Sequence, residues 1–312
     1  MKHLRLLRYV DEVARTGSIR KASERLNLTA SALNRRIQDI EDELGTAIFE
    51  RLPRGVRLNA AGELLIRHVR AQLADMERVR SQIEDLSGFR RGTVAIACSH
   101  ALANDFLPME IAAYRREFPL VEFDVRVASH SEALRTLADY EVDLAVIFRA
   151  SAGSGFQTLA SAEQRLVAIM RQDHPLAGEG SLRLRDCAGF PAALPDRSYG
   201  GRQSLEDAMA RSSFRLPAVV ESNSFEFLRN YVRFENAITF QIEIGAPPGL
   251  RMRDGLVSRP IDARDVPPAR LVMGRLHGRT LPVAAAKFAE QLARRLEEPA
   301  EATAGIASEP SS

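Results

Sequence analysis

The chain has 312 residues, 45% hydrophobic and 27% charged, with a net charge of +2. This is about twice the length of a common ~100–150-residue domain, so at least two domains are expected. The composition excludes a mainly disordered chain. No run of ~18 apolar residues occurs, so no membrane span is expected, and arginines interrupt the first apolar residues, which argues against a signal peptide. The only cysteines, Cys98 and Cys187, lie far apart. A disulfide framework and a zinc ribbon are excluded, and a reducing cytoplasm fits best.

The charge is unevenly distributed along the chain. Residues 1–91 hold 18 Lys and Arg against 13 Asp and Glu, a net of +5, whereas residues 92–312 have a net of −3. Arginine accounts for 40 of the 43 basic residues. A biased genome composition explains this skew, although the planar guanidinium also suits phosphate and base recognition. The basic N-terminal third is therefore the candidate partner for nucleic acid.

Three short helical patterns open the chain. A first helix is predicted by apolar residues at three- and four-residue spacing, namely Leu4, Leu7, Val10 and Val13. Gly17 suits the position after a helix end, and Ser18 can cap the next helix, which is expected over about residues 18–26. After a tight turn at residues 27–29, a third helix is expected from Thr29 to Leu44, with Gly45 ending it.

The third helix has a free polar face near its start, and a basic hairpin is expected to follow it. The face consists of Thr29, Ala30, Ser31, Asn34, Arg35 and Gln38. Such side chains can hydrogen-bond base edges in a DNA major groove, although a plain solvated face would look the same. A hairpin over residues 50–58 would project Arg51, Arg54 and Arg57 toward phosphates or a minor groove. Ser18, Arg20 and Lys21, at the second helix, complete the predicted DNA-contacting set.

These segments resemble the winged helix-turn-helix of LysR-type transcriptional regulators. The resemblance is carried by Ala22-Ser23-Glu24-Arg25-Leu26, Ala32-Leu33-Asn34-Arg35-Arg36-Ile37, Glu41-Asp42-Glu43-Leu44-Gly45-Thr46, Phe49-Glu50-Arg51 and residues 54–62. It implies sequence-specific binding to promoter DNA and regulation of transcription. This chain has Ala30-Ser31 where the family often has Gln-Pro, and Asn34 where it often has Ser, so base preference cannot be transferred. Asn34 could make a bidentate contact to adenine instead.

A long helix is predicted over residues 59–86, which lack proline. Its apolar residues recur in a nearly heptad seam: Ile66, Val69, Leu73, Met76, Val79, Ile83 and Leu86. The seam could pack on its own domain or pair with a second helix, and pairing is favoured because a helix between domains has little else to lie on. The family resemblance implies dimerisation here, which would place two recognition helices about 34 Å apart on a pseudo-palindromic site. Residues 89–92 are expected to form a basic hinge.

Strand and helix patterns alternate after the hinge. Strands are expected over residues 94–98, 121–127, 143–148, 165–170, 192–194, 218–220, 237–240 and 271–274, with helices from residues 106, 131, 204, 225 and 283. This predicts an α/β domain with a largely parallel sheet, in two lobes around a cleft. Gly92-Thr93-Val94-Ala95-Ile96 and residues 141–146 resemble the effector-binding domain of the same family, which has the fold of type II periplasmic binding proteins.

Candidate effector residues follow from this topology, because ligands sit beyond the carboxyl ends of strands and near helix N-termini. They are Ser99, His100, Ser129 and Ser131 in the first lobe, and Arg197, Ser198, Asn223, Ser224 and Phe225 in the second. Helix N-termini together with Arg197 favour a small carboxylate. A metal or redox site at Cys98 and His100 is not favoured, because no second His or Cys lies at ligand spacing. His130 and His174 are expected at the surface.

The sequence thus predicts an all-α winged helix-turn-helix over residues 1–59, a dimerisation helix and hinge over 60–91, a two-lobed effector-binding domain over 92–298 and a disordered tail over 299–312. Expected partners are double-stranded DNA, a small-molecule effector, a second copy in a homodimer or a homotetramer, and RNA polymerase. No cofactor, metal or catalytic site is expected: Ser18-Ile19-Arg20-Lys21 fits S-x-x-K, but no S-D-N or K-T-G accompanies it. The alternative is a solute-binding protein or an enzyme on the same two-lobe fold.

Overall fold

The computed structural model describes residues 2–86, 91–148, 155–197, 199–246 and 255–297. Contacts divide the chain into two compact units, Met1–Phe89 with Thr280–Val283, and Arg90–Arg279 with Ala284–Ser312. The predicted tail at 299–312 and most of the predicted hinge lie outside the described residues. In the part of the chain that is described, every helix is too short or too polar to cross a lipid bilayer.

The first unit begins with the three predicted helices: α1 spans Lys2–Thr16, α2 spans Ile19–Arg25 and α3 spans Ala30–Leu44. The predicted N-cap at Ser18 and the helix end at Gly45 are confirmed, and Thr29 is a further N-cap, at the start of α3. Ser18 Oγ accepts a hydrogen bond from the Lys21 amide, and Thr29 Oγ1 accepts one from the Ala32 amide at 3.2 Å. Gly45 adopts a φ of 68° at the end of α3, a conformation that glycine adopts without strain.

The predicted hairpin forms a wing of two antiparallel strands, β1 (Phe49–Leu52) and β2 (Gly55–Leu58). Its base is attached to α3, because Glu41 Oε1 accepts hydrogen bonds from the backbone amides of Ile48 at 2.8 Å and Phe49 at 3.2 Å. Both side chains also enter the core of the unit, whose buried members are Val10, Val13, Ala22, Leu33, Ile37, Ile48, Phe49, Ile66 and Val69. The wing is therefore held in a fixed position beside α3.

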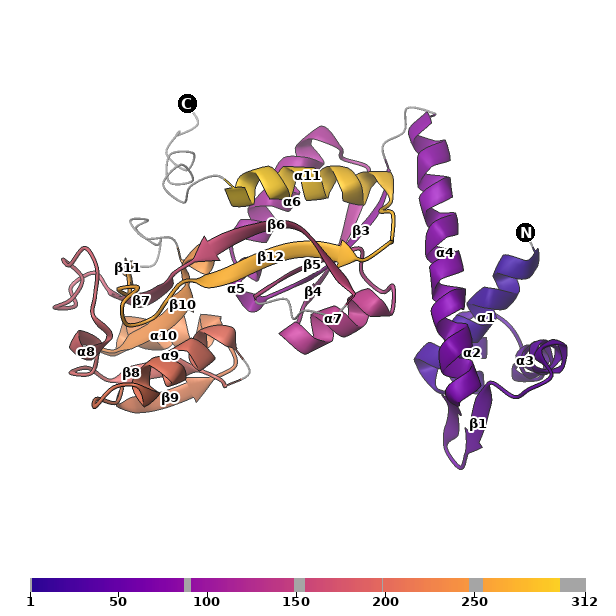
Figure 1. The fold of residues 1–312 in the computed structure, drawn as a ribbon, viewed down its shortest axis with the longest axis horizontal. Coiled ribbons are helices and arrows are strands. Elements are labelled where there is room, and N and C mark those ends of the chain that lie inside the picture. Colours follow the sequence, from indigo (N-terminus) through magenta and orange to yellow (C-terminus); the bar gives the residue numbers. More distant parts are fainter. Residues whose placement is uncertain (1, 87–90, 149–154, 198, 247–254, 298–312) are drawn as a thin grey trace. The chain divides into compact units, whose positions relative to one another are not determined.

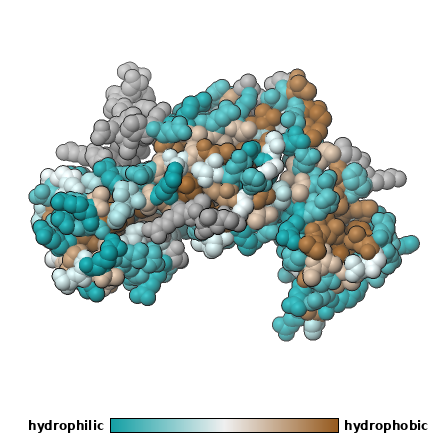
Figure 2. Space-filling view, in the orientation of Figure 1, coloured by the Kyte–Doolittle hydropathy of each residue, from teal (hydrophilic) through white to brown (hydrophobic). Residues whose placement is uncertain are grey.

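The long helix α4 (Ala60–Leu86) uses its apolar residues in two ways. Ile66 and Val69 are buried in the core of the first unit, and Leu73 packs against it. Packing on its own domain is thus correct for the first half of the predicted seam. In the second half, Ile83 is 59% exposed and Leu86 is 89% exposed, and Figure 2 shows hydrophobic surface at this end of α4.

The first lobe of the second unit is a five-stranded sheet in the order β4-β3-β5-β12-β6. Its strands are β3 (Gly92–Cys98), β4 (Val121–Val127), β5 (Leu144–Phe148), β6 (Phe156–Gln164) and β12 (Ala269–Leu276). Helices α6 (Phe106–Glu117) and α11 (Val283–Glu297) cover one face through a cluster of aromatic rings, and α7 (His130–Ala138) covers the other (Figure 1).

The second lobe has a sheet in the order β11-β7-β10-β8-β9. Its strands are β7 (Leu166–Arg171), β8 (Ala192–Pro195), β9 (Ala218–Ser222), β10 (Ile238–Ile242) and β11 (Leu256–Pro260). Helices α8 (Leu184–Cys187) and α9 (Gly200–Ala210) pack on one face and α10 (Phe225–Phe234) on the other. The two lobes confirm the predicted two-lobed α/β architecture.

The prediction of a largely parallel sheet is wrong for half of the strand pairs. Each sheet joins three parallel strands to two antiparallel ones: β4, β3 and β5 are parallel, as are β10, β8 and β9, whereas β12, β6, β7 and β11 pair antiparallel. Strands β6 and β11 were not predicted. The chain leaves the first lobe after β6, builds the second lobe, and returns as β12 between β5 and β6.

One buried polar side chain in the second unit, His174, differs from its predicted position. His174 is expected at the surface, but the residue is 3% exposed because it packs against Phe190, with 4.3 Å between the two ring centres.

Asp143 and Arg279 form a buried ion pair at 2.5 Å, and each side chain is less than a tenth exposed. The Ala95 amide also donates to Asp143, and Arg279 donates to the Val142 carbonyl, so this pair links the segment after β12 to β3 and to the start of β5.

Candidate nucleic-acid interface and effector cleft

The predicted DNA-contacting face of α3 is exposed and lines a cavity of about 700 Å³. Its lining is formed by Ser31, Asn34, Arg35, Gln38, Asp39, Glu41 and Asp42. Polar and basic residues occupy the first half of the helix, and acidic residues occupy the second half. Because carboxylates repel phosphates, only the first turns of α3 suit the edges of DNA bases. Arg36 lies off this face, with its guanidinium over the Tyr9 ring at 5.5 Å.

The wing arginines occupy three different settings. Arg57 pairs with Glu50 across the hairpin at 2.7 Å, and Arg51 donates from Nη2 to Asn34 Oδ1 on α3 at 3.2 Å. Arg54 lies exposed in the turn between β1 and β2. The wing thus presents positive charge beside the polar face of α3, which is the arrangement needed to contact phosphates while α3 contacts bases.

The remaining predicted residues surround this face, and several have structural roles as well. Ser18 and Thr29 cap α2 and α3, and the Thr29 and Ser31 hydroxyls lie 3.2 Å apart. Arg20 pairs with Glu24 at 3.4 Å, while Lys21 and Ala30 are exposed. A hydroxyl that caps a helix still has a lone pair and a proton available, so Ser18 and Thr29 keep the capacity for a further hydrogen bond.

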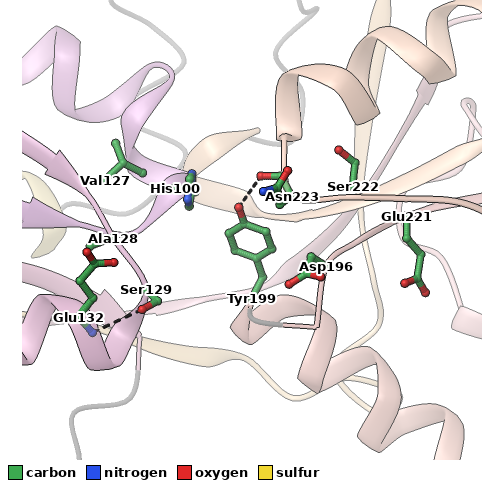
Figure 3. A pocket seen from close by; sticks show the side chains of 10 residues that line it. All are labelled: His100, Val127, Ala128, Ser129, Glu132, Asp196, Tyr199, Glu221, Ser222 and Asn223. Atoms are coloured by element: carbon green, nitrogen blue, oxygen red, sulfur yellow. Dashed lines mark hydrogen bonds between the residues drawn. The ribbon is translucent and has the colours of Figure 1, made fainter.

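The second unit contains a cavity of about 550 Å³ between its two lobes (Figure 3). The first lobe contributes His100, Val127, Ala128, Ser129 and Glu132, and the second contributes Asp196, Tyr199, Glu221, Ser222 and Asn223. These residues lie at the carboxyl ends of β4, β8 and β9 and at the starts of α5 (His100–Ala103), α7 and α9. The cavity is therefore located where the parallel strands of both sheets end.

Aromatic and hydroxyl groups hold the second-lobe wall in place. The Tyr199 hydroxyl donates to the carbonyl of Asn223 at 2.5 Å, which joins the loop before α9 to the loop before α10 (Figure 3). The Tyr199 ring contacts Phe225 on its own lobe and His100 on the first lobe, each with 5.0 Å between ring centres. Tyr199 thus bridges the two lobes at the cavity.

Charge in the cavity differs from the prediction. Of the described residues that line it, Glu132, Asp196 and Glu221 are acidic and none is Lys or Arg. Glu221 is paired with the buried Arg202 at 2.8 Å. Burial lowers the pKa of His100, which favours the neutral form of its imidazole. The N-termini of α7 and α10, the positive ends of their helix dipoles, lie next to Ser129 and Asn223.

The structure brings together three of the predicted effector residues, His100, Ser129 and Asn223, at the cavity. Ser224 caps α10, Phe225 supports Tyr199, Ser99 precedes α5, and Ser131 lies beside the Ser129 hydroxyl. Arg197 is not among the lining residues: its side chain is 75% exposed and pairs with Glu206 at 3.2 Å. Ser198 lies outside the described residues.

Sequence reasoning missed Tyr199, Asp196, Glu132 and Glu221. Helix α9 begins at Gly200, four residues before the predicted start at Ser204, so the loop that holds Tyr199 was placed in the wrong position. Gly201 lies within α9, where a side chain would contact Leu166 and Ile242. Glu132 and Glu221 carry no signal in the sequence, because nothing local marks which side faces the other lobe.

Neither cysteine is suited to redox chemistry. Cys98 and Cys187 are buried, and desolvation raises the pKa of each thiol to about 12. Because the thiolate is the reactive form, both side chains are inert at neutral pH. Among the described residues, no group of three or more His, Cys, Asp or Glu side chains is arranged to hold a metal ion.

Comparisons with known proteins agree with both halves of this architecture. Residues 4–63 match the family "Bacterial regulatory helix-turn-helix protein, lysR family", and residues 87–297 match "LysR substrate binding domain". A probable nitrogen assimilation transcriptional activator of Synechococcus elongatus is 26% identical over 224 residues, covering 71% of this chain and 72% of the relative.

Solved structures show the same fold. Full-length OxyR from Pseudomonas aeruginosa, carrying one substitution, superimposes with a TM-score of 0.69 at 20% identity, covering 92% of this chain and 96% of that one. Full-length CbnR, solved in complex with its target DNA, has a TM-score of 0.60 at 18% identity, covering 94% and 99%. With a helix-turn-helix before a two-lobed α/β domain, and family matches that together span most of its length, this chain belongs to the LysR-type transcriptional regulators.

Proposed function

We propose that this regulator reads promoter DNA with α3 and the wing, and that a small molecule bound between the two lobes changes its activity on that DNA. The observation that carries the second part is the cavity lined from both lobes, by Ser129 and His100 on one side and Tyr199 and Asn223 on the other. A ligand that contacts both lobes binds one arrangement of them more tightly and shifts the population toward it.

On the DNA side, we assign base contacts to the start of α3 and backbone contacts to its surroundings. Ser31, Asn34, Arg35 and Gln38 line the exposed face of α3 and suit the major groove. Arg51, Arg54 and Arg57, with Ser18, Arg20 and Lys21 at α2 and Thr29 and Ala30 at the start of α3, suit phosphates and sugars. A gel shift with the intergenic DNA upstream of the gene tests this assignment. Failure of the full chain to retard any such DNA at low salt would contradict it.

For the effector, we propose a small carboxylate that also carries hydroxyl or ammonium donors. The N-termini of α7 and α10 favour a negative group. The acidic side chains of Glu132, Asp196 and Glu221 disfavour a ligand that is negative throughout, and they accept hydrogen bonds from donor groups. A 2-hydroxy acid or a 2-amino acid meets both requirements.

Thermal unfolding of the full chain with 2-hydroxy acids, 2-amino acids and their matching amides tests this class. An acid that binds should raise the melting temperature, because a ligand at 100 times its Kd adds about 2.7 kcal/mol to the free energy of unfolding. The matching amide should not raise it. Asn223→Ala should reduce the shift, whereas Arg197→Ala, which alters a residue outside the cavity, should preserve it. Equal shifts by acid and amide would exclude a carboxylate.

We also propose a homodimer that pairs through the C-terminal half of α4. Leu86 and Ile83 are exposed apolar residues at the end of the predicted seam, and a second copy would cover them. Sedimentation of Leu86→Glu should show more monomer than the unsubstituted chain. Leu64→Glu is the matched control, since Leu64 is 65% exposed on the same helix but lies outside the seam. Equal dimer fractions in all three proteins would contradict the pairing.

A further inference from the structure

A hydrogen bond joins the wing to the recognition face. Arg51 in β1 donates from Nη2 to Oδ1 of Asn34 in α3 at 3.2 Å, although the two residues are 17 positions apart. Both are located on elements that are held in place. Glu41 binds the backbone at the base of β1, and the buried Leu33 and Ile37 flank Asn34 on the inner side of α3.

The chemistry of the two groups determines how Asn34 is oriented. A guanidinium has N–H donors and no acceptor, so only the carboxamide oxygen of Asn34 can face it. The amide nitrogen of Asn34, with its two protons, then faces away from Arg51. The pair consequently presents the N–H groups of Asn34 and Arg51, and the hydrogen bond from Arg51 occupies one of the two lone pairs of the Asn34 oxygen.

This hydrogen bond competes with the bidentate contact to adenine considered from the sequence, because both use the Asn34 oxygen. That contact needs the Asn oxygen to accept from adenine N6 while the Asn nitrogen donates to N7. Guanine instead presents two acceptors, O6 and N7, in the major groove. A pair rich in donors matches the two acceptors of guanine, whereas the adenine N6 amino group would have to share the Asn34 oxygen with the Arg51 guanidinium.

We propose that Arg51 sets the base preference of Asn34, so that the Asn34–Arg51 pair selects guanine over adenine at one operator position. The inference rests on the proposed DNA-binding function of α3. It makes Arg51 a specificity-determining residue, acting on the orientation of Asn34, in addition to adding positive charge to the wing.

The test is a selection of full-length protein on a randomised duplex library, followed by binding measurements on the selected operator with each base pair exchanged. Asn34→Ala identifies the position that Asn34 reads, because the preference should disappear only there. At that position, the unsubstituted protein should favour guanine over adenine by about tenfold. Arg51→Met, which removes all donors, should free the oxygen of Asn34 and move the preference toward adenine.

Two further variants separate this role from a general loss of charge. Arg57→Met removes a wing arginine that pairs with Glu50 and not with α3. It should weaken binding to every DNA sequence without changing the ratio of affinities for guanine and adenine. Arg51→Lys retains one donor toward Asn34 and should restore part of the preference for guanine. Thermal unfolding of each variant confirms that the first unit remains folded.

The outcomes distinguish the inference from the function beneath it. If the selection with the unsubstituted protein enriches no sequence, both the DNA-binding function and the role of the pair are overturned. An enriched operator whose guanine-to-adenine ratio at the Asn34 position is the same with Arg51→Met would overturn the role of Arg51 alone. A preference for adenine in the unsubstituted protein would also overturn it.

Discussion

The backbone of Gly17 passes so close to Gly55 that a side chain on Gly55 would place its Cβ 2.3 Å from the Gly17 carbonyl oxygen. The same oxygen accepts a hydrogen bond from the Val56 amide at 2.8 Å. Gly17 lies in the turn between α1 and α2, and Gly55 begins β2. The wing is therefore attached to the helix-turn-helix by backbone groups, in addition to the Glu41 contact at its base.

Gly55→Ala should destabilise the first unit and weaken DNA binding, because the new methyl group would collide with a backbone oxygen at a φ of 121°. Backbone strain of this kind costs about 1–3 kcal/mol. Gly45→Ala is the matched control, since Gly45 also has a positive φ but has no atom within 4 Å of the added Cβ. Denaturant unfolding should show a larger loss in the free energy of unfolding for Gly55→Ala than for Gly45→Ala. A smaller loss than that of Gly45→Ala would refute the close contact.

Arg54→Ala should weaken binding to all DNA sequences by a similar factor. Arg54 is exposed in the wing turn, where it can neutralise a phosphate, so its loss should lower the slope of log K against log salt by about one. Arg135→Ala removes the same charge from α7 in the second unit and should leave the slope unchanged. Titrations at several salt concentrations measure both, and an unchanged slope for Arg54→Ala would remove Arg54 from the set of phosphate contacts.

Arg279→Met should destabilise the second unit by about 3–5 kcal/mol, because it leaves the Asp143 carboxylate buried without its cation. Adding Asp143→Asn to the same chain should recover part of the loss, since the uncompensated charge is then gone. Urea unfolding of the two variants provides the comparison. If the double variant were less stable than Arg279→Met, the buried charge would not be the cause.

Asp265 provides a test of pH dependence. Its carboxylate accepts hydrogen bonds from Arg183 Nε at 2.9 Å and from the Leu184 amide at 2.7 Å, and the Arg183 guanidinium holds the pKa of Asp265 below its usual range. A carboxyl whose pKa is lower in the folded state stabilises the fold at any pH above its pKa in the unfolded chain, which is near 3.9. This stabilisation is lost as the pH falls through the lowered pKa of the folded state. Asp265→Asn should therefore reduce the melting temperature at pH 7, and the difference should narrow below about pH 4. A difference that stayed constant down to the acid transition would exclude this linkage.

The first unit could be predicted almost completely from its sequence because its signals are local. The spacing of Leu33 and Ile37 defines the buried side of α3, and Ser18, Thr29 and Gly45 mark helix ends through bonds to residues three or four positions away. Such contacts are present in any short window of the chain. The contact between Arg51 and Asn34 was not predictable in this way, because it depends on how the wing is placed beside α3.

The second unit was harder to predict because its decisive contacts join distant segments. Strand β6 alternates small and polar residues, and it becomes a strand by pairing with β12, whose Arg270 lies opposite Glu163. His174 follows polar residues in the sequence, yet Phe190 covers it in the folded chain. Tyr199 reaches the cavity only because α9 starts at Gly200, and the charge of Arg197 is directed to Glu206 instead.

The position of β12 has a consequence for the order in which the protein can fold during synthesis. This strand lies between β5 and β6, but it is translated after the whole second lobe. The second lobe occupies one uninterrupted stretch, from Leu166 to Pro260, and its first and last strands pair directly. It can therefore fold as the chain emerges, while the edges of β5 and β6 remain uncovered until residues 269–276 arrive. Such unpaired edges invite aggregation, so chains truncated shortly after Pro260 should be the most prone to it.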